Sequence, residues 1–288
     1  MLSLDTFIFF VILSFVASMV NGGLGYGYSS ISVPIALLVE TNKILNPAYA
    51  LLEALINTIM LGLAGKKHIL ATFKRVLPIA VMVIPGVAVG SLGLSLIPSS
   101  TLKLVVYAIL LPLILLQASG IRKPIKKEKR AGLALGFGIG TLYSLTTISG
   151  PPIALFWNNQ GMIKEEFKAA LAQIRVVESY MTLASYFLLG IISVQSLDIF
   201  TAIAPPVLIG LPLGMLLAKN IKPETFRRVC MSFDGWVVAY ALSSLLISQL
   251  HVAANMAYAF LALVFVVDGV LLYRFFTGRQ KMDTFSAH

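Results

Sequence analysis

Five charged residues stand inside long apolar stretches of the sequence, and their types suit the handling of ions. They are Glu53, Arg175, Glu178, Asp234 and Asp268. A charged side chain at the centre of a bilayer costs about 3 kcal/mol on insertion scales, so such residues are functional candidates. Arg175 could attract an anion, and Glu53 and Glu178 could carry a coupling proton. We expect Asp234 and Asp268 to serve helix packing.

Arg175 and Glu178 stand three residues apart in one apolar stretch. On a helix this spacing places both side chains on one face, within reach of each other. The sequence leaves two interpretations open. The residues form a structural ion pair that fixes helix packing, or Arg175 attracts an anion while a glutamate titrates.

Few residues in this chain are arranged as metal ligands, nucleotide-binding loops or catalytic nucleophiles would be. The three histidines are scattered, without the spacing of metal ligands. The glycine run at 136–140 lacks the preceding strand of a nucleotide-binding loop. No nucleophile elbow is present. The sequence therefore predicts no catalytic residue, no metal site and no cofactor, and we expect the protein not to be an enzyme.

Two interruptions rich in glycine or proline separate apolar stretches, at 21–27 and 149–152. They release backbone groups that lipid cannot satisfy, so each break should be buried in protein or line a wet cavity. A half-helix that begins after a break offers free N–H groups and a positive dipole end, which suit an anion. Hydroxyl donors for that anion would come from Ser29, Ser30, Thr146, Thr147 and Ser149.

Helices in a lipid bilayer must position these residues. The chain has 288 residues, 58% hydrophobic and only 12% charged, whereas soluble domains carry about 25% charged residues. The apolar runs are long rather than alternating, so the predicted fold class is an all-α polytopic membrane protein. We expect apolar segments at 4–20, 28–39, 47–65, 76–97, 101–118, 131–148, 151–158, 168–190, 198–218, 228–248 and 253–276.

An internal duplication is visible in the order of matching residues. The segment 34–37, Pro-Ile-Ala-Leu, recurs at 152–155. Glu53 matches Glu178 at an offset of 125 residues. A Gly-x-x-x-Gly pair at 86–90 recurs at 210–214. We predict two repeats, each with a broken or re-entrant element and three spans, followed by one extra C-terminal helix.

Lysine and arginine predict the orientation of these repeats. The net charge of +10 comes from clusters at 66–75, 122–130, 219–228 and 274–281. We expect these clusters in cytoplasmic loops and a tail, and we expect no nucleic acid partner. The pattern requires 4–39 and 131–158 to enter and leave on one side, which makes the repeats inverted and places the N-terminus outside. The predicted divisions are a first repeat 1–119, a basic loop 120–130, a second repeat 131–250, a helix 251–276 and a cytoplasmic tail 277–288.

The two breaks and the duplication around a basic loop resemble the TauE/SafE family, the sulfite exporter or DUF81 group of bacterial membrane proteins. The resemblance rests on the glycine-rich stretch 22–27, on Pro34, and on the second break. It implies transport of small sulfur-containing anions such as sulfite or organosulfonates. Carried over, it implies a pathway lined by Gly22, Gly23, Gly25, Gly27, Pro34, Ser149, Gly150, Pro151 and Pro152.

We therefore expect a secondary transporter of small anions in the bacterial inner membrane, with export as the favoured direction and proton coupling through Glu53 or Glu178. Inverted repeats with broken helices near the midplane are the construction of many such carriers. The expected partners are a small anion and the lipid bilayer, and a homodimer is left open. The alternatives are a non-transporting scaffold or assembly protein, a membrane-embedded lipid-modifying enzyme, or a channel.

Overall fold

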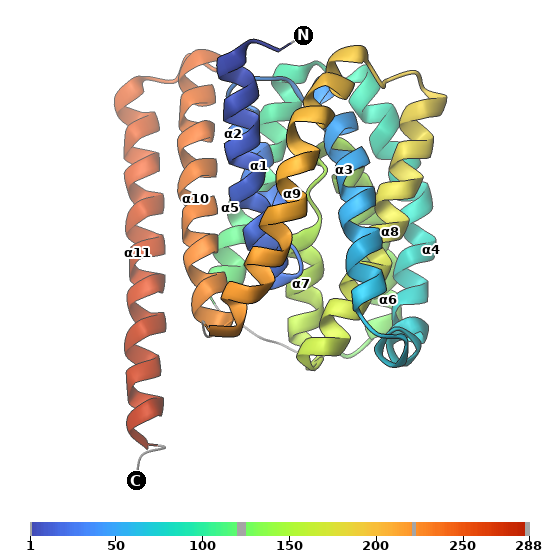
Figure 1. The fold of residues 1–288 in the computed structure, drawn as a ribbon. Helices are drawn as coiled ribbons and strands as arrows, with labels where there is room; N and C mark the ends of the chain where they lie inside the picture. Colours follow the sequence, from blue (N-terminus) through green and yellow to red (C-terminus); the bar gives the residue numbers. More distant parts are fainter. Residues whose placement is uncertain (1, 120–124, 221–222, 286–288) are drawn as a thin grey trace.

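A computed structural model describes residues 2–119, 125–220 and 223–285, and within these ranges the chain forms eleven helices and no strand (Figure 1). The predicted all-α class is confirmed. Arg122, Lys123 and Lys222 of the predicted basic clusters lie outside the described residues. The helices are α1 (Leu4–Leu24), α2 (Tyr28–Ala36), α3 (Asn42–Leu63), α4 (Lys66–Leu96), α5 (Ser99–Ala118), α6 (Glu128–Thr146), α7 (Gly150–Asn159), α8 (Lys164–Leu188), α9 (Val194–Asn220), α10 (Pro223–Ser248) and α11 (Ala254–Phe285).

Seven of the described helices are long and apolar enough to cross a membrane: α1, α3, α4, α5, α9, α10 and α11. The shortest of these apolar stretches has 18 residues, or about 27 Å at 1.5 Å per residue, close to the hydrocarbon thickness. By contrast α2 has 9 residues and α7 has 10, which is too short to span. The fold is that of a multi-pass membrane protein.

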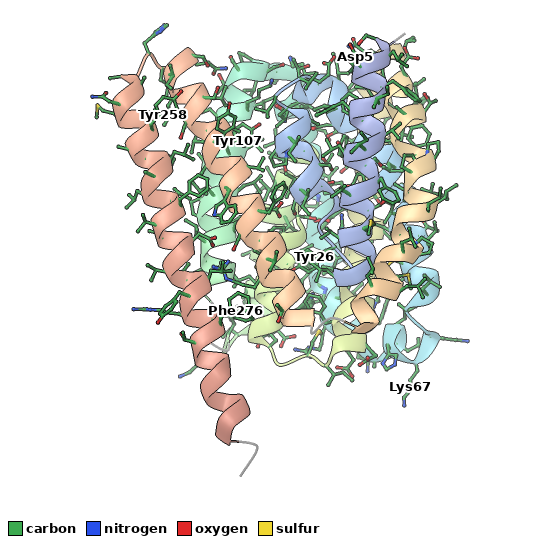
Figure 2. The ribbon with its side chains drawn as sticks, turned by 60° about the vertical axis from the view of Figure 1, so that its left-hand side comes forward. Asp5, Tyr26, Lys67, Tyr107, Tyr258 and Phe276 are labelled. Carbon is green, nitrogen blue, oxygen red and sulfur yellow. The ribbon has the colours of Figure 1, made fainter. Side chains whose placement is uncertain are left out.

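Two helical hairpins enter the bundle from opposite ends. Asp5 at the start of α1 lies at the upper end in Figure 2, and Lys67, just beyond α3, lies at the lower end. Because α3 crosses the bundle, the segment from α1 to the start of α3 enters and returns at the upper end. Figure 1 shows α6 and α8 both beginning at the lower end, so the α6–α7 hairpin enters from there. The helices that carry Glu53 and Glu178 therefore run in opposite directions.

Each hairpin packs against a long helix of the other half of the chain. The α1 helix lies along α9, and α4 lies along α6. Glycines allow close approach: a Cβ on Gly22 would lie 2.1 Å from the Leu211 carbonyl oxygen, and one on Gly140 would lie 2.4 Å from that of Val83. Small residues give membrane helices this contact. Such reciprocal packing is what the predicted duplication requires, and the repeat itself stays a prediction.

The basic clusters correct the predicted helix boundaries. We expected 66–75 to be a loop, but all of it belongs to α4, and α11 continues to Phe285 through most of the predicted tail. The physical reason is length. The 31 residues of α4 measure about 46 Å, whereas the hydrocarbon core is about 30 Å thick. A helix can therefore project into water, where its charged residues are solvated without interrupting the backbone hydrogen bonds.

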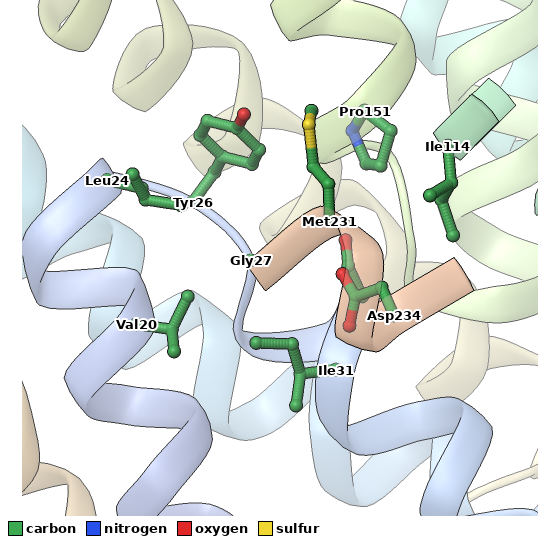
Figure 3. A pocket seen from close by; sticks show the side chains of 10 residues that line it. Val20, Leu24, Tyr26, Gly27, Ile31, Ile114, Pro151, Met231 and Asp234 are labelled. Carbon is green, nitrogen blue, oxygen red and sulfur yellow. The ribbon is translucent and has the colours of Figure 1, made fainter. Parts of the chain in front are cut away.

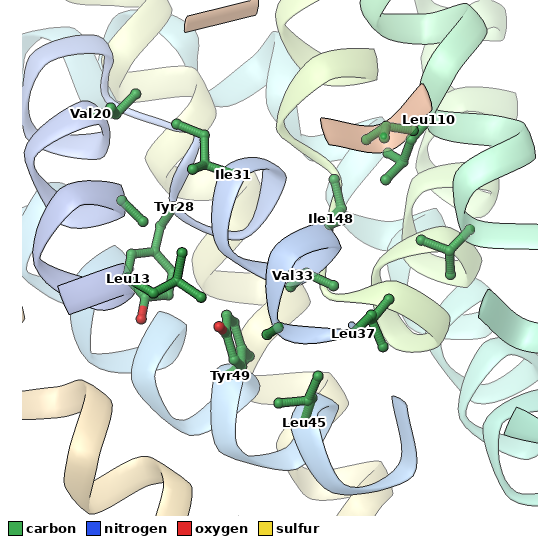
Figure 4. Close-up of a cluster of buried hydrophobic side chains, with 14 of the residues drawn as sticks. Leu13, Val20, Tyr28, Ile31, Val33, Leu37, Leu45, Tyr49, Leu110 and Ile148 are labelled. Carbon is green, nitrogen blue, oxygen red and sulfur yellow. The ribbon is translucent and has the colours of Figure 1, made fainter. Parts of the chain in front are cut away.

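A buried apolar cluster holds α2 in place against α3 and α5 (Figure 4). The rings of Tyr28 and Tyr49 lie 5.6 Å apart, and Val33 and Leu37 are buried in the same cluster. The Tyr107 hydroxyl on α5 donates a 2.9 Å hydrogen bond to the Pro34 carbonyl oxygen. These contacts fix the short helix and so fix the hydroxyl groups at its start.

Candidate functional site at the two helix breaks

Glycines allow the chain to turn at the first break. The α1 helix ends at Leu24, Gly25 follows with φ of 83°, and Gly27 has φ of 110° just before α2 begins. Residues with a side chain rarely adopt such left-handed conformations, whereas glycine does so without steric strain. The chain can therefore reverse within three residues and leave the first turn of α2 beside α3.

The second break uses different residues. Thr147 ends α6 with φ of 57°, Ser149 precedes α7, and prolines fill the first turn of α7. Proline suits this position because its missing N–H would have no partner in the helix. The two breaks touch: a Cβ added to Gly150 would lie 3.0 Å from the ring of Tyr26.

Glu53 on α3 is held from both halves of the chain. The Arg175 Nη2 atom on α8 donates a 2.6 Å hydrogen bond to Glu53 Oε1 as part of an ion pair. The Ser29 hydroxyl on α2 donates to the same oxygen. Asn57, one turn further along α3, donates a 3.3 Å bond to the Arg175 carbonyl oxygen. All four side chains are buried, so this ion pair ties α3 to α8 inside the bundle.

Glu178, one turn beyond Arg175, has a different environment. The Ser149 hydroxyl donates a 2.5 Å hydrogen bond to Glu178 Oε2. Tyr143 on α6 lies close enough to both glutamates and Arg175 to interact electrostatically with all three. The arginine that the helix spacing placed beside Glu178 instead pairs with Glu53 across the bundle.

Several polar atoms in this network have no hydrogen-bond partner among the described residues. They are Glu178 Oε1, and Nε and Nη1 of Arg175. Arg175 is 3% exposed and both glutamates are fully buried. Buried polar groups normally find partners, and such exceptions often mark a functional role. These two guanidinium nitrogens carry N–H donors of the kind that bind oxyanions.

The predicted site residues fall into distinct groups. Ser29 and Ser149 contact the carboxylates, whereas the hydroxyls of Thr146 and Thr147 bond to nearby main-chain carbonyls. Gly22 packs against α9. Gly23 is buried near the end of α1, and Pro152 lies in the first turn of α7. A Cβ added to Gly25 would lie 3.4 Å from the Lys168 side chain.

A small pocket gathers residues from both breaks around a residue that we had expected to serve packing. Gly27 and Ser30 line it from the first break, Pro151 from the second, and Asp234 from α10 (Figure 3). The available signal for Asp234 was its charge within an apolar stretch. Tyr143 and Asn57 were not among the predicted site residues, since a polar residue in a membrane helix gives no sign of its partners.

Asp268 behaves as a packing residue. Arg228 Nη2 lies 2.8 Å from Asp268 Oδ1 in a buried ion pair between α10 and α11. The same guanidinium also donates to the Ser232 hydroxyl and to the Asp268 carbonyl oxygen. This pair attaches α11 to α10.

The fold and this network define a polytopic α-helical membrane protein with charged groups gathered where two broken helices meet, an arrangement found in membrane carriers. The family model for the sulfite exporter TauE/SafE matches residues 10–241. The chain therefore belongs to the TauE/SafE family, which is a family of membrane transporters. Searches of curated proteins and of solved structures each returned no match.

Proposed function

We propose that this protein is a secondary transporter that exports small sulfur-containing or organic anions, such as sulfite or organosulfonates, across the bacterial inner membrane. The observation that carries the proposal is Arg175. Its guanidinium is buried where the two broken halves meet, and two of its nitrogens have no partner among the described residues. The family match supports the class of substrate.

Proton coupling follows from competition for Arg175. An anion that binds the guanidinium competes with the Glu53 carboxylate, which holds it through Nη2 at 2.6 Å. Protonation of Glu53 removes the charge that holds the arginine and so favours the anion. Anion affinity and proton occupancy are therefore linked, and each changes the other by the same factor. Glu178 supplies a second proton-binding group beside the same arginine.

Electrostatics across the membrane support export. An inside-negative membrane potential favours outward movement of negative charge by about 2.3 kcal/mol per charge for each 100 mV, so it drives export whenever the anion carries more negative charge than the protons that move with it. The cationic start of α4 lies at the end opposite the N-terminus (Figure 2). Cationic segments favour the cytoplasm, so we place the N-terminus outside and the C-terminus inside.

The test is transport in proteoliposomes loaded with labelled sulfite, sulfoacetate or taurine, with an imposed pH gradient. We expect saturable flux of at least one anion, and its loss in Arg175→Ala. The matched control is Arg274→Ala, which removes an arginine that is exposed on α11 and should leave flux unchanged. If folded protein moves none of these anions, the sulfur-anion proposal is wrong and a scaffold role gains support.

Coupling is tested separately with Glu53→Gln and Glu178→Gln. The neutral side chains keep nearly the same volume but cannot release a proton. We expect flux in these variants to lose its dependence on the pH gradient. Unchanged pH dependence in both variants would remove the glutamates from the coupling mechanism while leaving anion transport intact.

A further inference from the structure

A third buried carboxylate faces the contact between the breaks, and the proposed mechanism does not use it. Asp234 on α10 is 7% exposed, and its Oδ1 atom finds no hydrogen-bond partner in the part of the chain that the structure describes. Asp268 and Glu53 each have an arginine, and Glu178 has Ser149. An ionised carboxylate left alone at this depth is strongly disfavoured, so an ionised Asp234 requires a partner that the described side chains do not supply.

The pocket beside Asp234 is small, and its lining is mostly apolar apart from Asp234, Ser30 and main-chain atoms of the first break. Its volume is about 10 Å³, close to the space that one water molecule needs. Ser30 contributes a hydroxyl group, and Gly27, which has no side chain, contributes main-chain atoms. Leu24 also lines the pocket at the end of α1, where the last carbonyl groups of a helix lack intrahelical donors. Figure 3 shows the Asp234 carboxylate beside Met231 and Ile31 at this position.

We propose that this pocket binds a monovalent alkali cation, with sodium best matched to its size. Asp234 is the charged ligand, and the Ser30 hydroxyl and the carbonyl groups at the end of α1 are neutral ligands. Hard cations prefer such oxygen ligands, and unwound backbone at broken membrane helices is known to coordinate sodium. A single carboxylate matches a single positive charge. The described residues contain no group of three His, Cys, Asp or Glu side chains that could hold a multivalent ion.

The position of the pocket relates the cation to the two breaks. Ser30 follows Ser29, which bonds Glu53, and Pro151 lies two residues after Ser149, which bonds Glu178. A cation at Asp234 would therefore lie beside both breaks, whose serines hold the two glutamates. This coupling role rests on the proposed transport function, whereas cation binding itself does not.

The experiment measures binding without any transported anion. The purified full chain in detergent is titrated with sodium chloride against choline chloride at constant ionic strength and pH. Thermal unfolding and the fluorescence of tryptophan are followed, since Trp236 lies two residues from Asp234. We expect a saturable rise in Tm with sodium, a similar response to lithium, and at least tenfold weaker binding of potassium.

Three variants make the result specific. Asp234→Asn keeps the side-chain volume and should abolish the sodium response. Ser30→Ala removes one neutral ligand and should weaken binding several-fold, which gives a graded measurement if Asp234→Asn does not fold. Asp5→Asn, an exposed residue at the far end of α1, should respond like the unchanged protein.

Two results would overturn the proposal. One is a rise in Tm that choline chloride reproduces or that Asp234→Asn retains. The other is a response to pH alone with no effect of sodium, lithium or potassium, which would make the occupant a proton. Loss of anion flux in proteoliposomes would leave the sodium titration unaffected, so the two proposals can fail independently.

Discussion

The two helix breaks bring a serine to a buried glutamate through different local chemistry. The first turns on Gly25 and Gly27 in left-handed conformations, whereas the second turns on Thr147 and continues into prolines. The sequence separation between serine and glutamate also differs, at 24 residues for Ser29 and Glu53 and 29 residues for Ser149 and Glu178. The common feature is therefore the contact itself rather than a repeated local sequence.

The difference lies in charge. Glu53 has both a serine and Arg175, whereas Glu178 has Ser149 and an oxygen without a partner among the described residues. Arg175 is thus the one arginine shared by these two carboxylates, although the two hairpins resemble each other. One guanidinium cannot neutralise two ionised glutamates. The binding of a proton or of an anion therefore changes the balance of charge in this network.

The largest expected effect comes from removing the shared arginine. Arg175→Ala leaves Glu53 as an unpaired buried carboxylate, and breaking a buried pair this way typically costs about 3–5 kcal/mol. We expect a loss of this size in unfolding experiments in detergent, together with loss of anion flux. Glu178→Gln should cost much less, because Glu178 has no ion pair in the described residues.

A double substitution separates stability from function at the same pair. Arg175→Ala combined with Glu53→Gln removes both charges and should recover most of the lost stability. Flux should remain absent, since the anion-binding group is gone. Recovery of flux in the double variant would show that Arg175 serves only to neutralise Glu53.

The next effect compares the two serines. Ser149→Ala removes the hydrogen-bonding partner of Glu178 and should destabilise by about 1–3 kcal/mol, the cost of leaving a buried polar group unsatisfied. Ser29→Ala should cost about 1 kcal/mol, because Arg175 still holds the same Glu53 oxygen. Unfolding of both variants in one detergent measures the difference, and equal losses would contradict the asymmetry.

The sequence predicted the positions of the breaks because glycine and proline have local backbone effects. The short helices α2 and α7 and the burial of Glu53, Arg175 and Glu178 followed from the same reading. The partner of Arg175 could not be predicted from the sequence. Helix spacing offered Glu178 as one possible partner, but the ion pair joins residues 122 positions apart, and no local pattern encodes such a contact. The pocket beside Asp234 could not be predicted for a related reason, since residues of α10 and of both breaks line it together.

A smaller effect tests how the hairpins pack. Gly140→Ala places a methyl group 2.4 Å from the Val83 carbonyl oxygen, and Gly22→Ala places one 2.1 Å from that of Leu211. Overpacking of this kind costs about 1–3 kcal/mol, with the larger loss expected for Gly22→Ala. Gly138→Ala is the control on α6, because its methyl group meets nothing within 4 Å. It should be neutral, or stabilising by up to about 1 kcal/mol through helix propensity.

The smallest effect is expected when the types of residue at the two turns are exchanged. Thr147 is β-branched and has φ of 57°, a conformation that costs an ordinary residue about 1–2 kcal/mol. Thr147→Gly relieves this strain but raises the backbone entropy of the unfolded chain by about 0.5–1 kcal/mol, and it loses the bond from the Thr147 hydroxyl to the Thr146 carbonyl. We expect a net change of less than about 1 kcal/mol. Gly27→Ala should destabilise, since glycine alone suits φ of 110° there. A strongly destabilised Thr147→Gly would show that the Thr147 side chain, rather than its backbone angle, holds the second break.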